Sequence, residues 1–138
     1  MFLYVVTNKL TKLSEMKRKE LDVCYWLNYV KQHPDLLKEG GYNNIYTYAV
    51  SVLGYSKATV DKYVKIGELY TYKDGDNKIH GVLNGFRVSQ LLELLTLNKE
   101  NVVRLVDSGF IGADMTTATL RELVKELKAK YPNSWLYR

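Results

Sequence analysis

Residues 49 to 65 read AVSVLGYSKATVDKYVK, and this stretch decides the fold of the region around it. Gly54 stands at a turn that requires a positive φ, a conformation in which a residue with a side chain is strained. Ser56 follows, and its hydroxyl can cap the start of a helix. Val60 and Val64 lie four residues apart and therefore share one face of that helix. The stretch predicts two short helices joined by a tight turn.

The neighbouring residues fit the same arrangement. Small Ala49 lets the first helix approach the second, Leu53 fills the space between them, and Tyr55 packs into the corner. Gly67 is expected to close the second helix in a left-handed conformation. These requirements together predict a helix-turn-helix over residues 43–66.

The outward side of the second helix follows by elimination from its buried side. It comprises Ser56, Lys57, Ala58, Thr59, Asp61, Lys62 and Lys65. A helix-turn-helix that binds DNA presents such a face to the major groove, and the amides of its first turn can reach phosphates. A lysine ammonium is a point charge suited to phosphate, whereas arginine reads guanine better, and this helix has no arginine. We therefore expect mainly electrostatic affinity with moderate sequence specificity.

Further helices are predicted before this motif. Residues 2–6 form a short apolar run that is consistent with either an edge strand or an extended arm. A helical pattern over 14–32 begins at Ser14, a good N-cap residue, and stops before Pro34. Pro34 then opens a connector of one or two helical turns, which ends at Gly40 and Gly41.

The segment after the motif predicts a hairpin and then more helices. Alternating residues on both sides of Asp74-Gly75-Asp76-Asn77 indicate a β-hairpin over 68–85. Apolar periodicity predicts three later helices, over 89–95, 98–108 and 117–131. The expected fold is mainly α, with a helix-turn-helix and a small β-hairpin. It is one domain over residues 1–138, made of a helical lobe at 14–67, the hairpin, and a C-terminal helical lobe at 86–131.

Composition is that of an ordinary globular protein. The chain has 138 residues, of which 46% are hydrophobic and 25% charged, and its net charge is +5. Most of the basic surplus lies in residues 1–66, which favours a polyanionic partner such as nucleic acid. Cys24 is the only cysteine, and no apolar run reaches membrane-spanning length. A cytoplasmic protein without a membrane partner is the simplest expectation.

The residues give no sign of catalysis or of a bound cofactor. There is no glycine loop that would cradle a phosphate, no nucleophile with a base beside it, and no pair of carboxylates on an apolar background. His33, His80 and Cys24 do not have the spacing of metal ligands. We expect a protein that is not an enzyme and needs no metal or cofactor.

Two segments resemble known families. Gly54-Tyr55-Ser56 followed by Thr59, Val60 and Val64 resembles the helix-turn-helix of many bacterial repressors, and the wider stretch 22–67 resembles DNA-binding proteins of phages, plasmids and integrative elements. Residues 88–92 and 114–125 are similar to the helical module behind the helix-turn-helix of ParB- and KorB-like partition proteins. The resemblance implies binding of double-stranded DNA by the second helix of the motif.

Two functions remain open on the sequence. The first is a transcriptional regulator or accessory factor of a mobile genetic element that binds DNA as a homodimer. The apolar C-terminal stripe, or the tail containing Trp135 and Tyr137, would supply the dimer interface. The second is a phage or mobile-element protein whose charged face binds and inhibits a host protein such as a CRISPR effector. Most tyrosines, including Tyr48 and Tyr63, are expected in the core. Tyr42, Tyr46, Tyr70 and Tyr72 are the tyrosines that could line a groove.

Overall fold

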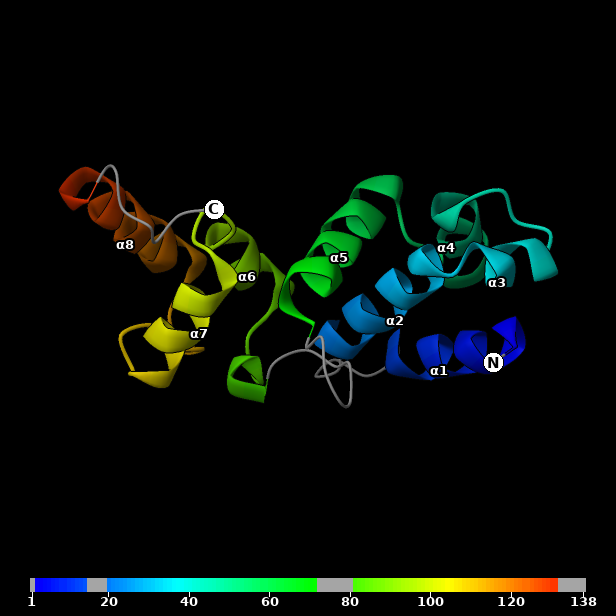
Figure 1. The fold of residues 1–138 in the computed structure, drawn as a ribbon, viewed down its shortest axis with the longest axis horizontal. Helices are drawn as coiled ribbons and strands as arrows, with labels where there is room; N and C mark the ends of the chain where they lie inside the picture. The colour runs from blue at the N-terminus through cyan, green and yellow to red at the C-terminus, as the bar shows by residue number, and fades with distance from the viewer. Residues whose placement is uncertain (1, 15–19, 72–80, 132–138) are drawn as a thin grey trace. The chain divides into compact units, whose positions relative to one another are not determined.

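The computed structural model describes residues 2–14, 20–71 and 81–131, and the protein is mainly helical (Figure 1). The chain groups into two compact units, residues 1–79 and residues 80–138. Each unit contains buried apolar side chains of its own. The predicted helix-turn-helix lies entirely within the first unit.

The first unit is built around one central helix. Its helices are α1 (Leu3–Ser14), α2 (Glu20–Gln32), α3 (Pro34–Glu39), α4 (Ile45–Leu53) and α5 (Lys57–Tyr70). Helix α2 packs along α5 on one side and against α1 on another (Figure 1). Their apolar side chains form a core in which Val6, Leu27 and Tyr48 are fully buried. This core holds α5 along the side of α2. The side of α5 that faces away from α2 is uncovered.

Helix α5 lies very close to the backbone of α2 at Gly67. A Cβ atom on Gly67 would clash with the carbonyl oxygen of Cys24 and would lie 2.9 Å from Cβ of Asn28. The expectation that Gly67 ends the helix is wrong, because α5 continues to Tyr70. The glycine is required because the two helices pack closely at this point. The residues next to Gly67 in the sequence do not indicate this role.

The N-terminal segment is helical, and the expected edge strand or extended arm is a wrong prediction. Leu3, Val6 and Leu10 are buried at the spacing of one helix face. The apolar run at residues 2–6 alone was too short to distinguish this spacing from that of a strand. Ser14, expected to start a helix, is instead the last residue of α1, and its hydroxyl donates to the carbonyl of Thr11 at 2.9 Å.

Within residues 81–131, the described part of the second unit, the chain forms a 3₁₀ turn and three helices. They are η1 (Gly81–Leu83), α6 (Val88–Glu93), α7 (Lys99–Asp107) and α8 (Thr117–Lys130). The three predicted helices are confirmed to within two residues at each end. Gly109 follows α7 with a φ of 83°, and Thr116 caps α8 by accepting a hydrogen bond from the Thr119 amide. Helices α6 and α8 pack against each other in this unit.

The hairpin predicted over 68–85 is not confirmed. Its central residues, 72–80, lie outside the described part of the chain. Its first residues belong to α5, and residues 81–83 form the 3₁₀ turn. Tyr70 is buried with the rest of the inner face of α5, so the helical burial pattern extends further than the alternation of residues suggested.

Candidate nucleic-acid interface

Local side-chain chemistry sets the two ends of the α4–α5 turn. The side chain of Asn44 caps α4 by accepting a hydrogen bond from the Thr47 amide at 2.9 Å. Helix α4 ends at Leu53 and is followed by Gly54, which has a φ of 72°. The hydroxyl of Ser56 then caps α5 by accepting from the Thr59 amide at 3.2 Å. The predicted Ser56 cap and the predicted left-handed glycine are therefore confirmed.

Packing fixes the angle at which α5 leaves the turn. The ring of Tyr55 meets the ring of Tyr63 edge to face, with 5.5 Å between their centroids. The Tyr63 hydroxyl donates to the Glu20 carboxylate on α2 at 2.8 Å. Partial burial, together with this hydrogen bond, raises the pKa of Tyr63 well above its ordinary value. Tyr63 therefore joins the turn to the central helix of the unit.

The residues expected to contact DNA are brought together on the uncovered side of α5. Thr59 is half-buried and takes part in the cap, since its hydroxyl accepts from Ser56 at 3.0 Å. The other six are exposed: Ser56, Lys57, Ala58, Asp61, Lys62 and Lys65. We call these six residues and Thr59 the α5 face.

The lysines and the aspartate of the α5 face form a regular pattern. Lys57, Asp61 and Lys65 follow one another at intervals of four residues and therefore lie along one line of the helix, with Lys62 beside it. The opposite side of α5 is apolar, and Val60, for example, is fully buried. The helix thus separates a lysine-bearing surface from the core.

Tyr46 also belongs to this surface. The residues predicted from the sequence belong only to the second helix of the motif, so Tyr46 was not among them. It lies on α4, and its hydroxyl donates to Oδ1 of Asp61 at 2.5 Å. This hydrogen bond to a carboxylate raises the pKa of Tyr46. The Nζ atom of Lys57 lies 5.0 Å from the centroid of the same ring, which is a cation–π distance. The sequence indicated only that Tyr46 could line a groove.

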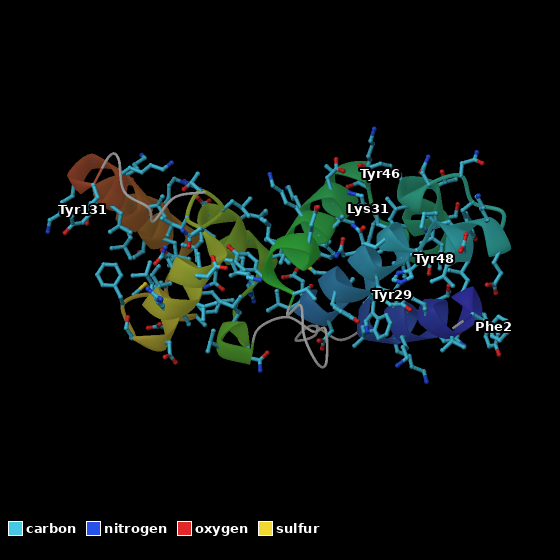
Figure 2. The ribbon with its side chains drawn as sticks, in the orientation of Figure 1. Phe2, Tyr29, Lys31, Tyr46, Tyr48 and Tyr131 are labelled. Carbon is cyan, nitrogen blue, oxygen red and sulfur yellow. The ribbon has the colours of Figure 1, made fainter. Side chains whose placement is uncertain are left out.

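A groove of about 340 Å³ adjoins these residues. Ile45 and Val64 provide its apolar lining, and Tyr46 and Lys31 lie near each other on it (Figure 2). Asp61, Lys65 and Glu68 complete the lining. The groove therefore carries charges of both signs, and the more strongly basic surface is the α5 face itself.

No family model, curated protein or solved structure matches this chain. The function therefore has to be argued from the geometry and charge of the surface.

Two further properties of the described residues concern membranes and metal ions. No helix among residues 2–14, 20–71 and 81–131 has the length and apolar character needed to cross a membrane. Within the same residues, no group of three or more His, Cys, Asp or Glu side chains is arranged to hold a metal ion.

Proposed function

We propose that this protein binds double-stranded DNA by placing the N-terminal half of α5 in the major groove. Lys57, Lys62 and Lys65 would contact phosphates and base edges, and Ala58 would lie close to the bases. The short side chain of Ala58 permits this approach because it adds no bulk in the first turn of the helix.

One observation carries the proposal: a capped helix is buried on one side and presents a lysine-bearing face on the other. Three of the exposed α5-face residues are lysines and one is an aspartate. The preceding helix ends at a left-handed glycine, as a helix-turn-helix requires at its turn, and this supports the proposal. A helix that enters the major groove needs a rigid base and an uncovered face, because the DNA surrounds its outer side.

The biological role that fits this module is a transcriptional regulator or accessory factor of a mobile genetic element. A single reading helix contacts few base pairs, so helix-turn-helix proteins commonly act as dimers on two half-sites about one turn of DNA apart. A homodimer of this chain would place two α5 faces on one side of the duplex. In a monomer, the affinity of the lysines for DNA would come mainly from contacts with phosphates.

The proposal is tested by measuring binding to random-sequence duplex DNA over a range of salt concentrations. Phosphate contacts make the affinity fall steeply with salt, and each lysine lost should reduce the slope by about one. The variant K57A/K62A should bind more weakly than the wild type and with a shallower slope. Absence of wild-type binding at low salt would overturn the proposal.

A matched control removes the same charge from another part of the chain. Lys125 and Lys128 are exposed on α8, so K125A/K128A lowers the net charge equally without touching α5. We expect this variant to keep the wild-type salt slope. Equal losses in both double variants would mean that net charge, and not the α5 face, determines binding.

A second candidate function is the binding and inhibition of a host protein, such as a CRISPR effector. It is favoured by Asp61, because a carboxylate in the middle of the α5 face opposes phosphates but suits a protein surface with charges of both signs. This function predicts a stoichiometric complex with one host protein that survives nuclease treatment. Loss of the partner on nuclease treatment would support DNA binding instead.

A further inference from the structure

The contacts of Asp61 distinguish it from the lysines around it. Its carboxylate is exposed, and its Oδ1 atom accepts the hydrogen bond of the Tyr46 hydroxyl. Among the residues that the structure describes, none forms an ion pair with it; the pairs that are seen are Arg121–Glu93 and Lys125–Glu122. A neutral donor on another helix, the Tyr46 hydroxyl, therefore fixes the orientation of the Asp61 carboxylate.

A carboxylate is an unfavourable choice for non-specific DNA binding. It is repelled by phosphates, and it can only accept hydrogen bonds. In the major groove, the groups that can donate to it are the amino groups of cytosine and adenine, and acidic side chains accept from N4 of cytosine. A fixed carboxylate on a DNA-facing helix therefore lowers affinity for most sequences and favours those with cytosine or adenine at one position of one strand.

Tyr46 also places a donor next to this acceptor. Lys57 lies over the Tyr46 ring, one helical turn before Asp61. A lysine donates to O6 and N7 of guanine, which are acceptors in the major groove. Tyr46 thus holds an acceptor and a donor side by side on the surface proposed to enter the groove.

We propose that Asp61 is a specificity-determining residue that selects cytosine in the major groove, and that Tyr46 is the positioning residue that orients it. The inference rests on the proposed function and deepens it. The free Oδ2 atom of Asp61 accepts from N4 of the cytosine, and Lys57 contacts guanine on the same or the neighbouring base pair. The α5 face then has one base preference in addition to its phosphate contacts.

The experiment selects binding sites from a random duplex library with the full-length wild type and with Asp61→Ala, Asp61→Asn and Tyr46→Phe. The wild type should prefer cytosine at one position by about tenfold. Asp61→Ala should lose this preference and bind the unselected library more tightly. Asp61→Asn should change the preference toward adenine, because an asparagine amide pairs with N6 and N7 of adenine. Tyr46→Phe keeps the ring under Lys57 and should weaken the cytosine preference.

The matched control is Glu68→Ala, which removes the same charge near the other end of α5, where Glu68 is exposed. It should leave the base preference unchanged. Far-UV circular dichroism checks that every variant is folded, since Asp61 and Glu68 are exposed and Tyr46 is half-buried. A purely structural role of Asp61 could weaken binding, but it would not exchange cytosine for adenine.

The outcomes separate the two proposals. If the wild type binds no duplex DNA at low salt, the proposed function fails and the role of Asp61 fails with it. If the wild type binds without any base preference, or if Asp61→Ala and Asp61→Asn keep the cytosine preference, DNA binding stands and the role of Asp61 is wrong. If only Tyr46→Phe keeps the full preference, the positioning role of Tyr46 is wrong.

Discussion

Replacing Gly67 with alanine should destabilise the packing of α5 on α2. The added Cβ atom would lie 2.8 Å from the carbonyl carbon of Cys24 and 2.9 Å from Cβ of Asn28, with the carbonyl oxygen of Cys24 closer still. Real Cβ atoms do not approach a backbone so closely. Because a backbone carbonyl inside a helix cannot rotate away, one of the two helices has to move.

Two effects of opposite sign determine the size of the change. Alanine stabilises the interior of a helix by about 1 kcal/mol relative to glycine. Inserting a methyl group into a filled contact costs about 1–3 kcal/mol, and a contact with backbone belongs at the upper end of this range. We therefore expect a net loss of about 2 kcal/mol in the free energy of unfolding. For a unit of this size, the loss lowers the melting temperature by on the order of 10 °C.

Urea denaturation followed by far-UV circular dichroism measures this loss. Gly54→Ala is the comparison, because Gly54 has a positive φ but no atom within 4 Å of the added Cβ. It should cost only the strain of the left-handed conformation, about 1 kcal/mol. A Gly67→Ala protein as stable as the wild type, or more stable, would refute the close packing of α2 and α5.

Three further predictions concern the same unit. Ser56→Ala removes the cap of α5 and should lower the free energy of unfolding by about 1 kcal/mol, whereas Ser56→Asp should restore most of it; equal stability of all three proteins in urea would contradict the cap. The raised pKa of Tyr63 means that the folded protein keeps this proton at pH values where the unfolded chain has lost it, so stability present below about pH 10 should be lost as the pH rises above it. Tyr63→Phe should make this alkaline loss less steep, and an unchanged pH dependence of urea denaturation would count against the Tyr63–Glu20 hydrogen bond. Cys24 is fully buried and its pKa is raised by that burial, so a thiol reagent should label it far more slowly in the native protein than in urea, and equal rates would show that α2 is not covered.

Much of the helix-turn-helix could be predicted from sequence because its signals are local. Asn44, Gly54 and Ser56 each act within three or four residues of their own position, through a cap or through a single backbone angle. The α5 face followed from the buried side of the same helix. All of these interactions are contained within one helix or one turn.

The wrong predictions involve partners that are distant in the sequence or windows that are short. Residues 2–6 gave too few positions to distinguish a helical period from a strand period. The burial of Leu10 together with Leu3 and Val6 shows the helical period, but burial is known only from the folded structure. Gly67 was interpreted from its own conformational freedom, whereas its role depends on Cys24, which lies more than forty residues earlier. The burial of a side chain and the close approach of two helices are set by tertiary contacts, so local sequence patterns do not show them.

The sequence by itself determined the position of α4, the turn, the start of α5 and the set of residues on the α5 face, but not the end of α5. Only the tertiary structure decided which residues of other helices contact that face. Tyr46 and Asp61 are fifteen residues apart on different helices, and nothing in their spacing predicts that the hydroxyl of one reaches the carboxylate of the other. The angle between α4 and α5 brings them together, and that angle is set by the packing of both helices on the common core with α2.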